Sequence, residues 1–524
     1  MTYGIQVVGD SSVGVAIKAA LAGAGLRSGV PSALTIVTGW PCVENLLGFE
    51  RASRSPFLLV ENAGGGSVAV GPVFGARESV CFGCYLARRR ANGGKQCRPS
   101  ISLSAPSLAR LVEYVRAVCE SRQVLYEQVQ ITPAGELINH VVLPVPGCAS
   151  CWSEPRERLA PGTDALVSDR VGLVHEVGEL PGTPEPFRGA IAVGCRTDAF
   201  WQVQALNRGM AVDETPERAR GRAVGESIER YCAAAMPAGL PVASARELGG
   251  RYIAPARLGG DGAAERDGRR ARWVRAHNLL TKEPVWVPAS AVYVPYGDGC
   301  AEAALDVQTS VGLGAGGDLD QAVRHGLAEI VERDATLRAW RHRLPVEAVT
   351  HRPFSVTGLH LARVADGSGL NVVVAFLESD APPLTSSGLG ARPDAKDAAR
   401  HAALEAVLTQ AWLCEWLRTN GRECPGVVQT MIDNALAHAL RPELAANRRR
   451  WLEPARAVNG NYSSVSWEAV LASFPEACFV DITTPDVETA GLKVVRVIVP
   501  DRVLADDDYT HSRLGGDATP HPFG

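Results

Sequence analysis

The spacing of hydrophobic positions predicts alternating strands and helices at the start of the chain. Residues 4–9 form a short, mostly apolar stretch typical of a strand, and 13–22 repeat apolar positions at helical spacing. An amphipathic helix is predicted at 107–121, and two further strands at 128–132 and 137–143 enclose a turn that contains Pro and Gly. This order of elements is typical of an α/β domain.

A change of composition separates this region from the rest of the chain. Pro, Gly and charged residues dominate 153–190, which is typical of a domain boundary. Beyond it strands and helices alternate again, while 341–356 and 420–451 are predicted to be irregular or peripheral segments. The final residues, 519–524, include two prolines and fit neither a helix nor a central strand. The predicted N-terminal domain, linker and C-terminal domain are 1–155, 156–189 and 190–524.

Composition and charge exclude several classes of protein. Of the 524 residues, 46% are hydrophobic and 21% are charged, and the net charge is −4. Basic residues form no stripe with interleaved aromatics, which argues against nucleic acid as a partner. No stretch approaches the roughly 20 apolar residues of a membrane span, and the start of the chain lacks the pattern of a secretory signal. The expected location is the cytoplasm, where the 13 cysteines are reduced thiols or metal ligands.

Two Cys-x-x-Cys pairs stand 63 residues apart in the N-terminal domain: Cys81 with Cys84, and Cys148 with Cys151. Two such pairs can supply the four thiolates of a tetrahedral zinc site, which leaves no position for water and is therefore structural. Two unrelated buried pairs, or a redox motif, are the alternatives, although a redox motif needs one pair only. Cys97 is a further candidate zinc ligand, which ranks below these four cysteines.

The most informative feature of the C-terminal domain is a repeated Glu-x-x-Glu-Arg sequence, at 226–230 and again at 329–333. Residues three apart lie on one face of a helix, so two facing helices gather four carboxylates that need cations between them. Oxygen ligands without histidine at the same spacing favour Mg²⁺, which usually also binds substrate phosphates, so ATP is expected with it. The carboxylates are Glu226, Glu229, Glu329 and Glu332.

Each repeat taken alone is also typical of a solvated helix surface. The glycines that precede the two helices, at 209 and within 312–317, favour the functional interpretation, because glycine permits close approach of backbone to phosphate. A carboxylate-bridged di-metal oxidase is a third possibility, but such proteins carry a Glu-x-x-His motif that these helices lack.

Residues 190–524 resemble the YcaO superfamily. The resemblance rests on the two glutamate helices, at 223–230 and 325–334, and on several shorter motifs. The shorter motifs are Arg208-Gly209, Ala403-Leu404-Glu405-Ala406, Asp481-Ile482-Thr483-Thr484-Pro485-Asp486, 491–500 and Arg513-Leu514-Gly515. The first 155 residues resemble the degenerate ThiF-like, or E1-like, scaffold domain that is often fused or partnered to azoline-forming members. The implied fold class is therefore α/β and α+β: an E1-like α/β domain with a zinc knuckle, then a YcaO-fold ATP-binding domain.

The resemblance implies an ATP-dependent cyclodehydratase that closes thiazoline or oxazoline rings in a ribosomally made peptide. A Cys, Ser or Thr side chain attacks the preceding amide carbonyl, the oxyanion takes the γ-phosphoryl group of ATP, and loss of phosphate leaves the azoline. The four repeated glutamates are implied as Mg²⁺ ligands. The other implied nucleotide-binding residues are Arg208, Arg230, Arg333, Glu405 and Arg496.

Some positions depart from the pattern of the family. Val311 stands where many members have the asparagine of a Ser-Asn-Gly motif. Gln321 stands in place of an acidic residue, and Leu408 in place of a glutamine. Azoline-forming relatives commonly end in a Pro-x-Pro-x-Pro run whose terminus reaches the active site. Here Pro522 and Gly524 belong to a shortened version of this run, which is expected to be ordered and catalytic.

The resemblance also implies partners. The chain starts directly on the predicted α/β unit, so a separate protein is expected to bind the leader of the precursor peptide. A homodimer and a pathway neighbour, a flavin-dependent azoline dehydrogenase, are expected as well. Other YcaO chemistry, thioamide or amidine formation, and a non-catalytic scaffold role stay open as alternatives.

Overall fold

The structure is a computed structural model of the chain. It describes residues 5–9, 11–26, 34–38, 56–75, 80–94, 101–121, 126–152, 162–201, 203–259, 268–296, 304–305, 308–453, 456–457, 464–505, 514–517 and 519–523. The chain forms two compact units, and neither is one continuous segment. The first unit contains 1–176, 194–202 and 484–491, and the second contains 177–193, 203–483 and 492–524.

The first unit is built on a six-stranded sheet with the order β1-β2-β3-β4-β5-β6. Strands β1, β2 and β3 are parallel, and the remaining neighbours are antiparallel. The elements are β1 (Ile5–Gly9), α1 (Ser11–Gly23), β2 (Leu34–Thr38), β3 (Phe57–Gly64), β4 (Ser67–Phe74), α3 (Phe82–Ala91), α4 (Ala105–Ser121), β5 (Glu127–Ile131) and β6 (Leu137–Val141). These bounds confirm the predicted α/β order, including the hairpin of β5 and β6.

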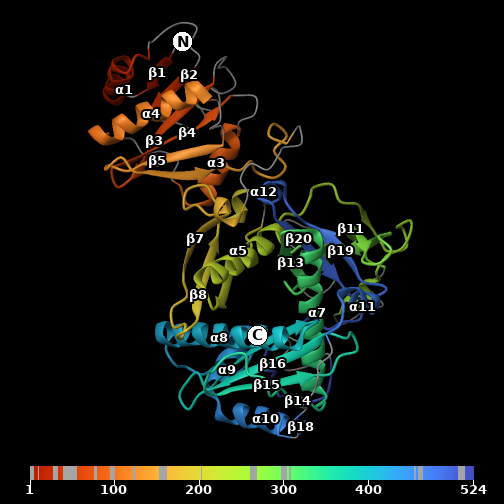
Figure 1. The fold of residues 1–524 in the computed structure, drawn as a ribbon. Helices are drawn as coiled ribbons and strands as arrows, with labels where there is room; N and C mark the ends of the chain where they lie inside the picture. Colours follow the sequence, from red (N-terminus) through yellow and green to blue (C-terminus); the bar gives the residue numbers. More distant parts are fainter. Residues whose placement is uncertain are drawn as a thin grey trace. The chain divides into compact units, whose positions relative to one another are not determined.

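Alternation along β3 explains how both faces of this sheet are covered. Leu58 and Val60 point toward the core that α1 and α4 share, whereas Phe57 and Leu59 point toward the core beneath α3. Figure 1 shows α1 and α4 together on the sheet. Helix α3 begins directly after Cys81, so the sheet face it covers is also the face on which the first cysteine pair lies.

In the described part of the chain, the strands from β7 onward form three sheets. One has the order β7-β8-β9, one has the order β10-β11-β19-β20-β13 with β12 paired to β11, and one has the order β17-β16-β15-β14-β18. Their bounds are β7 (Val174–Glu179), β8 (Arg188–Gly194), β9 (Arg208–Asp213), β10 (Val242–Ala243), β11 (Ala271–Asn278), β12 (Pro284–Pro288), β13 (Leu313–Gly316), β14 (Glu347–Ala348), β15 (Leu359–Val364), β16 (Asn371–Glu378), β17 (Thr385–Arg392), β18 (Arg456–Ala457), β19 (Cys478–Asp481) and β20 (Lys493–Ile498).

Three long helices connect these sheets: α5 (Pro216–Ala233), α7 (Leu319–Arg341) and α8 (Ala395–Asn420). Helix α5 packs on β9 and β13, α7 packs on β13, β20 and β17, and α8 packs on β17, β16 and β9. Each of the three helices therefore packs on strands from two different sheets, as Figure 1 shows.

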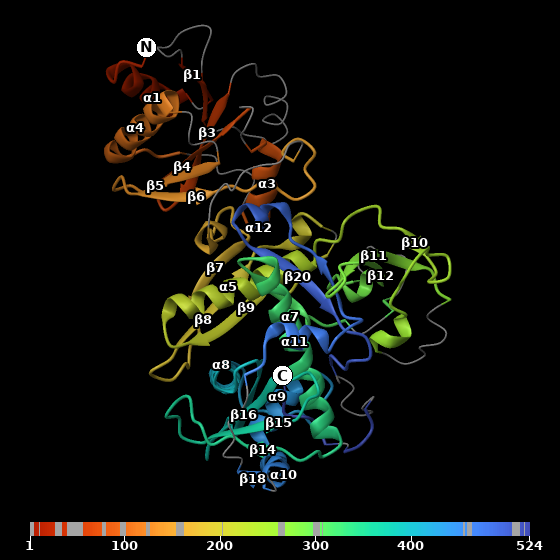
Figure 2. The ribbon, with the colours of Figure 1, turned by 45° about the vertical axis from the view of Figure 1, so that its right-hand side comes forward.

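Shorter helices complete the unit, namely α9 (Met431–Leu440), α10 (Pro442–Leu452) and α11 (Trp467–Ala472), while α12 (Pro485–Thr489) belongs to the first unit. The prediction of irregular structure at 420–451 is wrong for α9 and α10. Helix α9 packs against β17, and Figure 2 shows α10 close to β14 and β18. A capping box between Thr430 and Asp433 starts α9, and Pro442 occupies the first turn of α10. No described helix has the length and apolar character that a membrane span requires.

Candidate functional site

Thr215 and Asp318 set the start of the two helices that carry the repeated glutamates. Thr215 accepts a hydrogen bond from the N–H of Arg218 (3.4 Å) at the start of α5, and Asp318 accepts one from Gln321 (2.8 Å) at the start of α7. Pro216 follows Thr215 in the first turn of α5. These caps fix the helical register and hence which side chains face inward.

Glycines let the helices approach the strands closely. A Cβ atom at Gly209 of β9 would lie 2.0 Å from the carbonyl oxygen of Ala223 on α5. The same clash, at 2.2 Å, would occur between Gly314 of β13 and α7, and between Gly388 of β17 and α8. Only glycine fits at such a contact, so each helix lies directly on its strand.

The inner faces of α5, α7 and α8 bring five glutamates to the strands. Each carboxylate accepts a hydrogen bond from a strand or strand-end N–H, which holds it in place while a carboxylate keeps further acceptor capacity. The pairs are Glu226 with Met210 (2.8 Å), Glu229 with Ala315 (2.6 Å), Glu329 with Gly312 (2.9 Å), Glu332 with Ala391 (3.1 Å) and Glu405 with Leu389 (3.2 Å).

Burial and mutual repulsion change the ionisation of these glutamates. Burial, followed by the charges of Glu329 and Glu226, raises the pKa of Glu229 to about 8. Burial likewise raises the pKa of Glu329, and burial together with Glu405 raises the pKa of Glu332. Neighbouring carboxylates in this position cannot all ionise without compensating positive charge.

Glu405 differs from the other four. Burial acts to raise its pKa, but the charge of His401 and its hydrogen bond, with Nε2 and Oε1 3.1 Å apart, lower the pKa to about 2. In the Glu332–Glu405 pair the two pKa values therefore shift in opposite directions, that of Glu332 upward and that of Glu405 downward.

The donor set fits Mg²⁺ that is shared with a phosphate ligand. Among the described residues, no three of these glutamates bring one carboxylate oxygen each within 4.8 Å of one another. A cation bound only by protein would need such a group, whereas Mg²⁺ usually takes one or two carboxylates and completes its shell with water and substrate phosphates. Hard oxygen donors and raised pKa values agree with this arrangement.

The sequence-predicted arginines occupy different positions around the glutamates. Arg230 forms an ion pair with Glu226 (2.7 Å), and the buried Arg496 donates from Nε to the carbonyl of Ala291 (2.9 Å). The charge of Arg333 partly opposes the rise in the pKa of Glu329, and the buried Nε of Arg333 has no hydrogen-bond partner among the described residues. Arg208 is exposed at the start of β9. An unpaired guanidinium nitrogen beside carboxylates suits a phosphate oxygen.

Sequence reasoning missed a set of basic side chains one helical turn before the glutamates. Arg222, His325 and His401 each stand four residues before a glutamate, on α5, α7 and α8. The Nη2 atom of Arg222 lies 3.4 Å from Nδ1 of His401. Desolvation, followed by the charges of Arg392 and Arg222, lowers the pKa of His325, while its hydrogen bond with the carbonyl of Ala315 opposes this shift. The repeated basic-x-x-x-Glu spacing was the signal that could have identified them.

The end of the chain is anchored next to β17. The hydroxyl of Ser387 donates to the carbonyl of Pro522, and Asn434 donates to the carbonyl of His521 (2.7 Å). Phe523 is 1% exposed, and its ring centroid lies 6.2 Å from that of Trp340 and 6.3 Å from that of Trp451. Pro522 therefore lies beside the strand whose N–H groups bind Glu332 and Glu405. Gly524 lies outside the described residues.

The four cysteines of the two pairs come together in the first unit, and their sulfur atoms all lie within 4.8 Å of one another. The Sγ atoms of Cys81 and Cys148 are 3.7 Å apart, as are those of Cys84 and Cys151. Four thiolates at about 2.3 Å from a tetrahedral Zn²⁺ lie about 3.8 Å from one another. The group therefore fits zinc; the further candidate ligand, Cys97, lies outside the described residues.

Backbone N–H groups support this sulfur cluster. The N–H of Val145 donates to Sγ of Cys84 (3.2 Å), and the N–H of Cys81 donates to Sγ of Cys151 (3.3 Å). Hydrogen bonds from Cys81 and Cys84 lower the pKa of Cys151 to about 4, although burial opposes this shift. Thiolate-stabilising donors of this kind are typical of structural zinc knuckles.

Two relatives, each described as an uncharacterised protein, share part of the sequence. An uncharacterised protein of Methanothermobacter thermautotrophicus is 43% identical over 65 residues, which are 12% of this chain and only 16% of that protein. An uncharacterised protein of Mycobacterium tuberculosis is 26% identical over 315 residues, covering 54% of this chain and 68% of that protein.

Solved structures share the fold over nearly the whole chain. A heterocyclase in complex with substrate and cofactor matches with a TM-score of 0.72 and 19% identity, over 98% of this chain and 82% of that one. The heterocyclase TruD matches with a TM-score of 0.61 and 18% identity, over 98% and 81%. The combination of an N-terminal domain and a YcaO domain is therefore confirmed as the fold.

The family model for the YcaO cyclodehydratases, described as binding ATP and Mg²⁺, matches residues 212–502. This range contains α5, α7 and α8 and all five glutamates. The chain belongs to the YcaO cyclodehydratase family, whose members are ATP-dependent enzymes.

Proposed function

We propose that this chain catalyses ATP-dependent cyclodehydration of Cys, Ser or Thr residues in a ribosomally synthesised precursor peptide, which yields thiazoline or oxazoline rings. The observation that carries the proposal is the group of five buried or half-buried glutamates, each fixed by a strand N–H. Such a group of carboxylates needs cations for neutrality, and Mg²⁺ bound there can in turn bind the phosphates of ATP.

The proposed ligands of Mg²⁺ are Glu226, Glu229, Glu329 and Glu332. When bound, Mg²⁺ neutralises the charge that develops on the transferring phosphoryl group. Arg333 offers its unpaired Nε to a phosphate oxygen, while Arg230 and Arg496 hold the surrounding framework. Glu405 would complete the negative charge of the site, and the exposed Arg208 would reach a phosphate from the start of β9.

The reaction needs little covalent chemistry from the protein. The peptide thiol or hydroxyl adds to the preceding amide carbonyl and loses its proton. The carbonyl oxygen then takes the γ-phosphoryl group, so that ADP leaves, and loss of phosphate together with the amide proton forms the C=N bond of the azoline. The protein contributes orientation and electrostatic stabilisation. We place Pro522 and Gly524, at the anchored tail, beside the peptide.

The four cysteines would hold Zn²⁺ as a structural ion, because all four positions of its shell are filled by thiolates. Its chemistry there is to stabilise the fold around α3 and the segment that follows β6. The first unit is then a scaffold domain that does not adenylate a substrate.

Partners of the chain are proposed by analogy with its structural neighbours, one of which is described as a heterocyclase in complex with substrate and cofactor. Another, with a TM-score of 0.51 and 13% identity, is the E. coli microcin synthetase McbBCD complex with pro-MccB17 bound. We propose a precursor peptide, a separate leader-binding protein, a flavin-dependent azoline dehydrogenase acting afterwards, and a homodimer, all in the cytoplasm.

One observation favours a different role within the same pathway. Val311 is only 6% exposed, and it occupies the place of a polar residue in the motif before α7. A scaffold that binds peptide without consuming ATP would tolerate this change. Formation of a thioamide or an amidine is the other alternative.

The proposal is tested by incubating a precursor peptide with this protein, its leader-binding partner and Mg-ATP, followed by mass spectrometry. Loss of one water per ring, with ADP formed in equal amount, supports cyclodehydration. Replacement of oxygen by sulfur would assign thioamide formation instead. An unmodified peptide together with no ADP would assign the scaffold role.

A further inference from the structure

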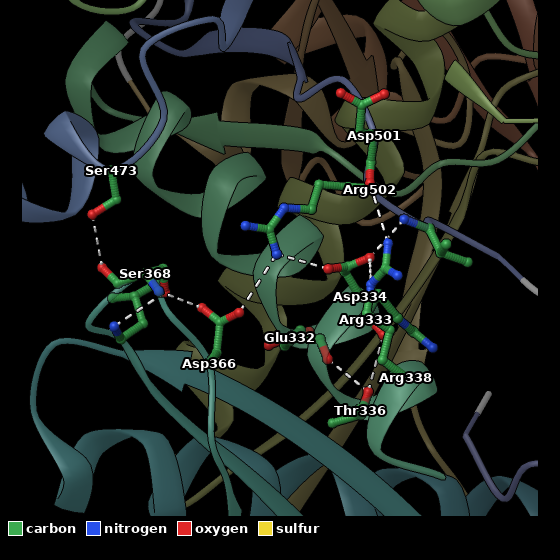
Figure 3. A network of polar contacts seen from close by, with 12 residues as sticks. Glu332, Arg333, Asp334, Thr336, Arg338, Asp366, Ser368, Ser473, Asp501 and Arg502 are labelled. Carbon is green, nitrogen blue, oxygen red and sulfur yellow. Dashed lines mark hydrogen bonds and ion pairs between the residues drawn. The ribbon is translucent and has the colours of Figure 1, made fainter. Parts of the chain in front are cut away.

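Asp334 is a buried carboxylate on α7, two residues after Glu332, that the proposed chemistry does not use. Its side chain is 1% exposed. It accepts hydrogen bonds from Nε of Arg338 (2.9 Å), Nη1 of Arg502 (2.7 Å) and the N–H of Val503 (2.7 Å), as Figure 3 shows for the network. A buried carboxylate with three donors is held in one orientation.

Arg502 connects this carboxylate to two other parts of the fold. Its Nη1 also lies 3.5 Å from Oδ1 of Asp366, in the connection from β15 to β16. Its guanidinium carbon lies 5.2 Å from the ring centroid of Phe474, two residues after the end of α11. Asp366 itself accepts a hydrogen bond from the N–H of Ser368 (2.8 Å), and Figure 3 shows Arg502 between Asp334 and Asp366. With Phe474, the arginine therefore contacts three separate segments.

The helix geometry links this network to the metal site. Two residues along an α-helix correspond to about 200° of rotation, so Asp334 and Glu332 lie on opposite faces of α7. One face is held by the N–H groups that bind Glu329 and Glu332, and the other by Asp334. The ends of side chains lie about 6 Å from the helix axis, so a rotation of about 10° moves a carboxylate by about 1 Å.

We propose that Arg502 is a positioning residue for the glutamates of α7. By tying Asp334 to Asp366 and Phe474, it fixes the rotation of α7 and so the distance of Glu329 and Glu332 from the glutamates of α5 and α8. The inference rests on the proposed function, because it assigns Mg²⁺ and ATP to these glutamates. Displacing a binding group by 1 Å is costly where phosphoryl groups must be held in line.

The test compares Mg²⁺-dependent ATP binding by the full chain with Arg502→Gln and Arg502→Lys. The matched control is Arg418→Gln, because Arg418 pairs with Glu415 on the outside of α8 and its side chain is 71% exposed. At fixed ATP, the Mg²⁺ concentration for half-saturation is expected to rise about tenfold in Arg502→Gln. Arg502→Lys, which keeps a charge for Asp334 alone, is expected to lie between this variant and the wild type.

Thermal unfolding without Mg²⁺ distinguishes positioning from stability. A lower unfolding temperature in Arg502→Gln with unchanged half-saturation by Mg²⁺ would make the bridge merely structural and overturn the inference. If Arg502→Gln does not fold, Asp366→Asn removes one arm of the bridge and is expected to raise the half-saturating Mg²⁺ concentration by a smaller factor; no rise overturns the inference. Absence of Mg²⁺-dependent ATP binding by the wild type would instead refute the proposed function itself.

Discussion

Arg88 and Asp486, which are 398 residues apart in the sequence, form an ion pair in which neither side chain is exposed. Arg88 also donates to the carbonyls of Leu143 and Pro144, at 3.0 Å each, and its guanidinium lies 4.9 Å from the ring centroid of Phe200. The segment 484–491, which stands between β19 and β20, is thereby part of the first unit.

Substitution of Arg88 by Met is expected to destabilise the protein by about 3–5 kcal/mol, because it leaves the carboxylate of Asp486 buried without its charged partner. Denaturant unfolding followed by fluorescence measures the change. The double substitution Arg88→Met with Asp486→Asn is expected to recover part of the loss, since no buried charge then remains. A single variant as stable as the wild type would show that the pair contributes nothing.

Removal of the sulfur cluster should unfold the first unit selectively. Cys151→Ser is expected to abolish bound zinc, measured by elemental analysis of the purified protein, and to lower its unfolding temperature. Cys424→Ser is the matched control, because Cys424 is exposed and lies outside the cluster. Equal zinc content in Cys151→Ser and wild type would contradict the assignment.

Phe523 should contribute to activity by anchoring the tail. Phe523→Ala removes a ring that is packed against Trp340, Phe376 and Trp451, at a cost of about 3 kcal/mol to the anchored state. Peptide cyclisation is expected to fall strongly in this variant and much less in Phe523→Leu, which keeps most of the buried area. If Phe523→Ala cyclised the peptide at the wild-type rate, the anchored tail would have no role in the reaction.

Affinity for Mg²⁺ should rise with pH. The pKa of Glu229 is raised to about 8 from an ordinary value of 4.5, so its contribution to stability is complete below about pH 4.5 and is lost as the pH rises through 8. Mg²⁺ needs the ionised carboxylate, and binding therefore releases a proton. Titration calorimetry at about pH 6.5 and about pH 8.5 should give tighter binding at the higher pH, and Glu229→Gln should remove most of that difference. Binding that does not depend on pH would be inconsistent with this ionisation.

Local signals explain what could be predicted from the sequence. Thr215 and Pro216 mark the start of α5, and the apolar alternation around 128–143 gives the hairpin of β5 and β6. The short helices α9 and α10 were missed because about ten residues give too few turns for a clear helical period. The spacing of the glutamates placed each pair on one helix face.

Contacts between distant segments could not be predicted in the same way. Glu332 accepts a hydrogen bond from the N–H of Ala391, and Arg222 of α5 contacts His401 of α8. Both contacts depend on how the three helices pack on the strands. The pair of Arg88 and Asp486 depends on a chain return that no local pattern encodes. Sequence spacing gives the face of a helix, whereas packing decides what that face meets.

Glu329→Gln tests the assignment of the metal ligands. The amide keeps the size of the side chain and can accept the N–H of Gly312, but it loses the charge for Mg²⁺. ATP turnover in the presence of peptide is expected to fall by about 100-fold or more. Glu347→Gln, on the partly exposed pair with Arg363, is the control and should retain turnover.

The central claim is that the amide oxygen of the peptide is phosphorylated and leaves as phosphate. It is tested most directly with a precursor peptide that carries a heavy oxygen isotope in the carbonyl preceding the residue to be cyclised. Mass spectrometry of the released phosphate should find the heavy oxygen there, one atom for each ring formed. Ring formation with unlabelled phosphate would contradict the proposed function.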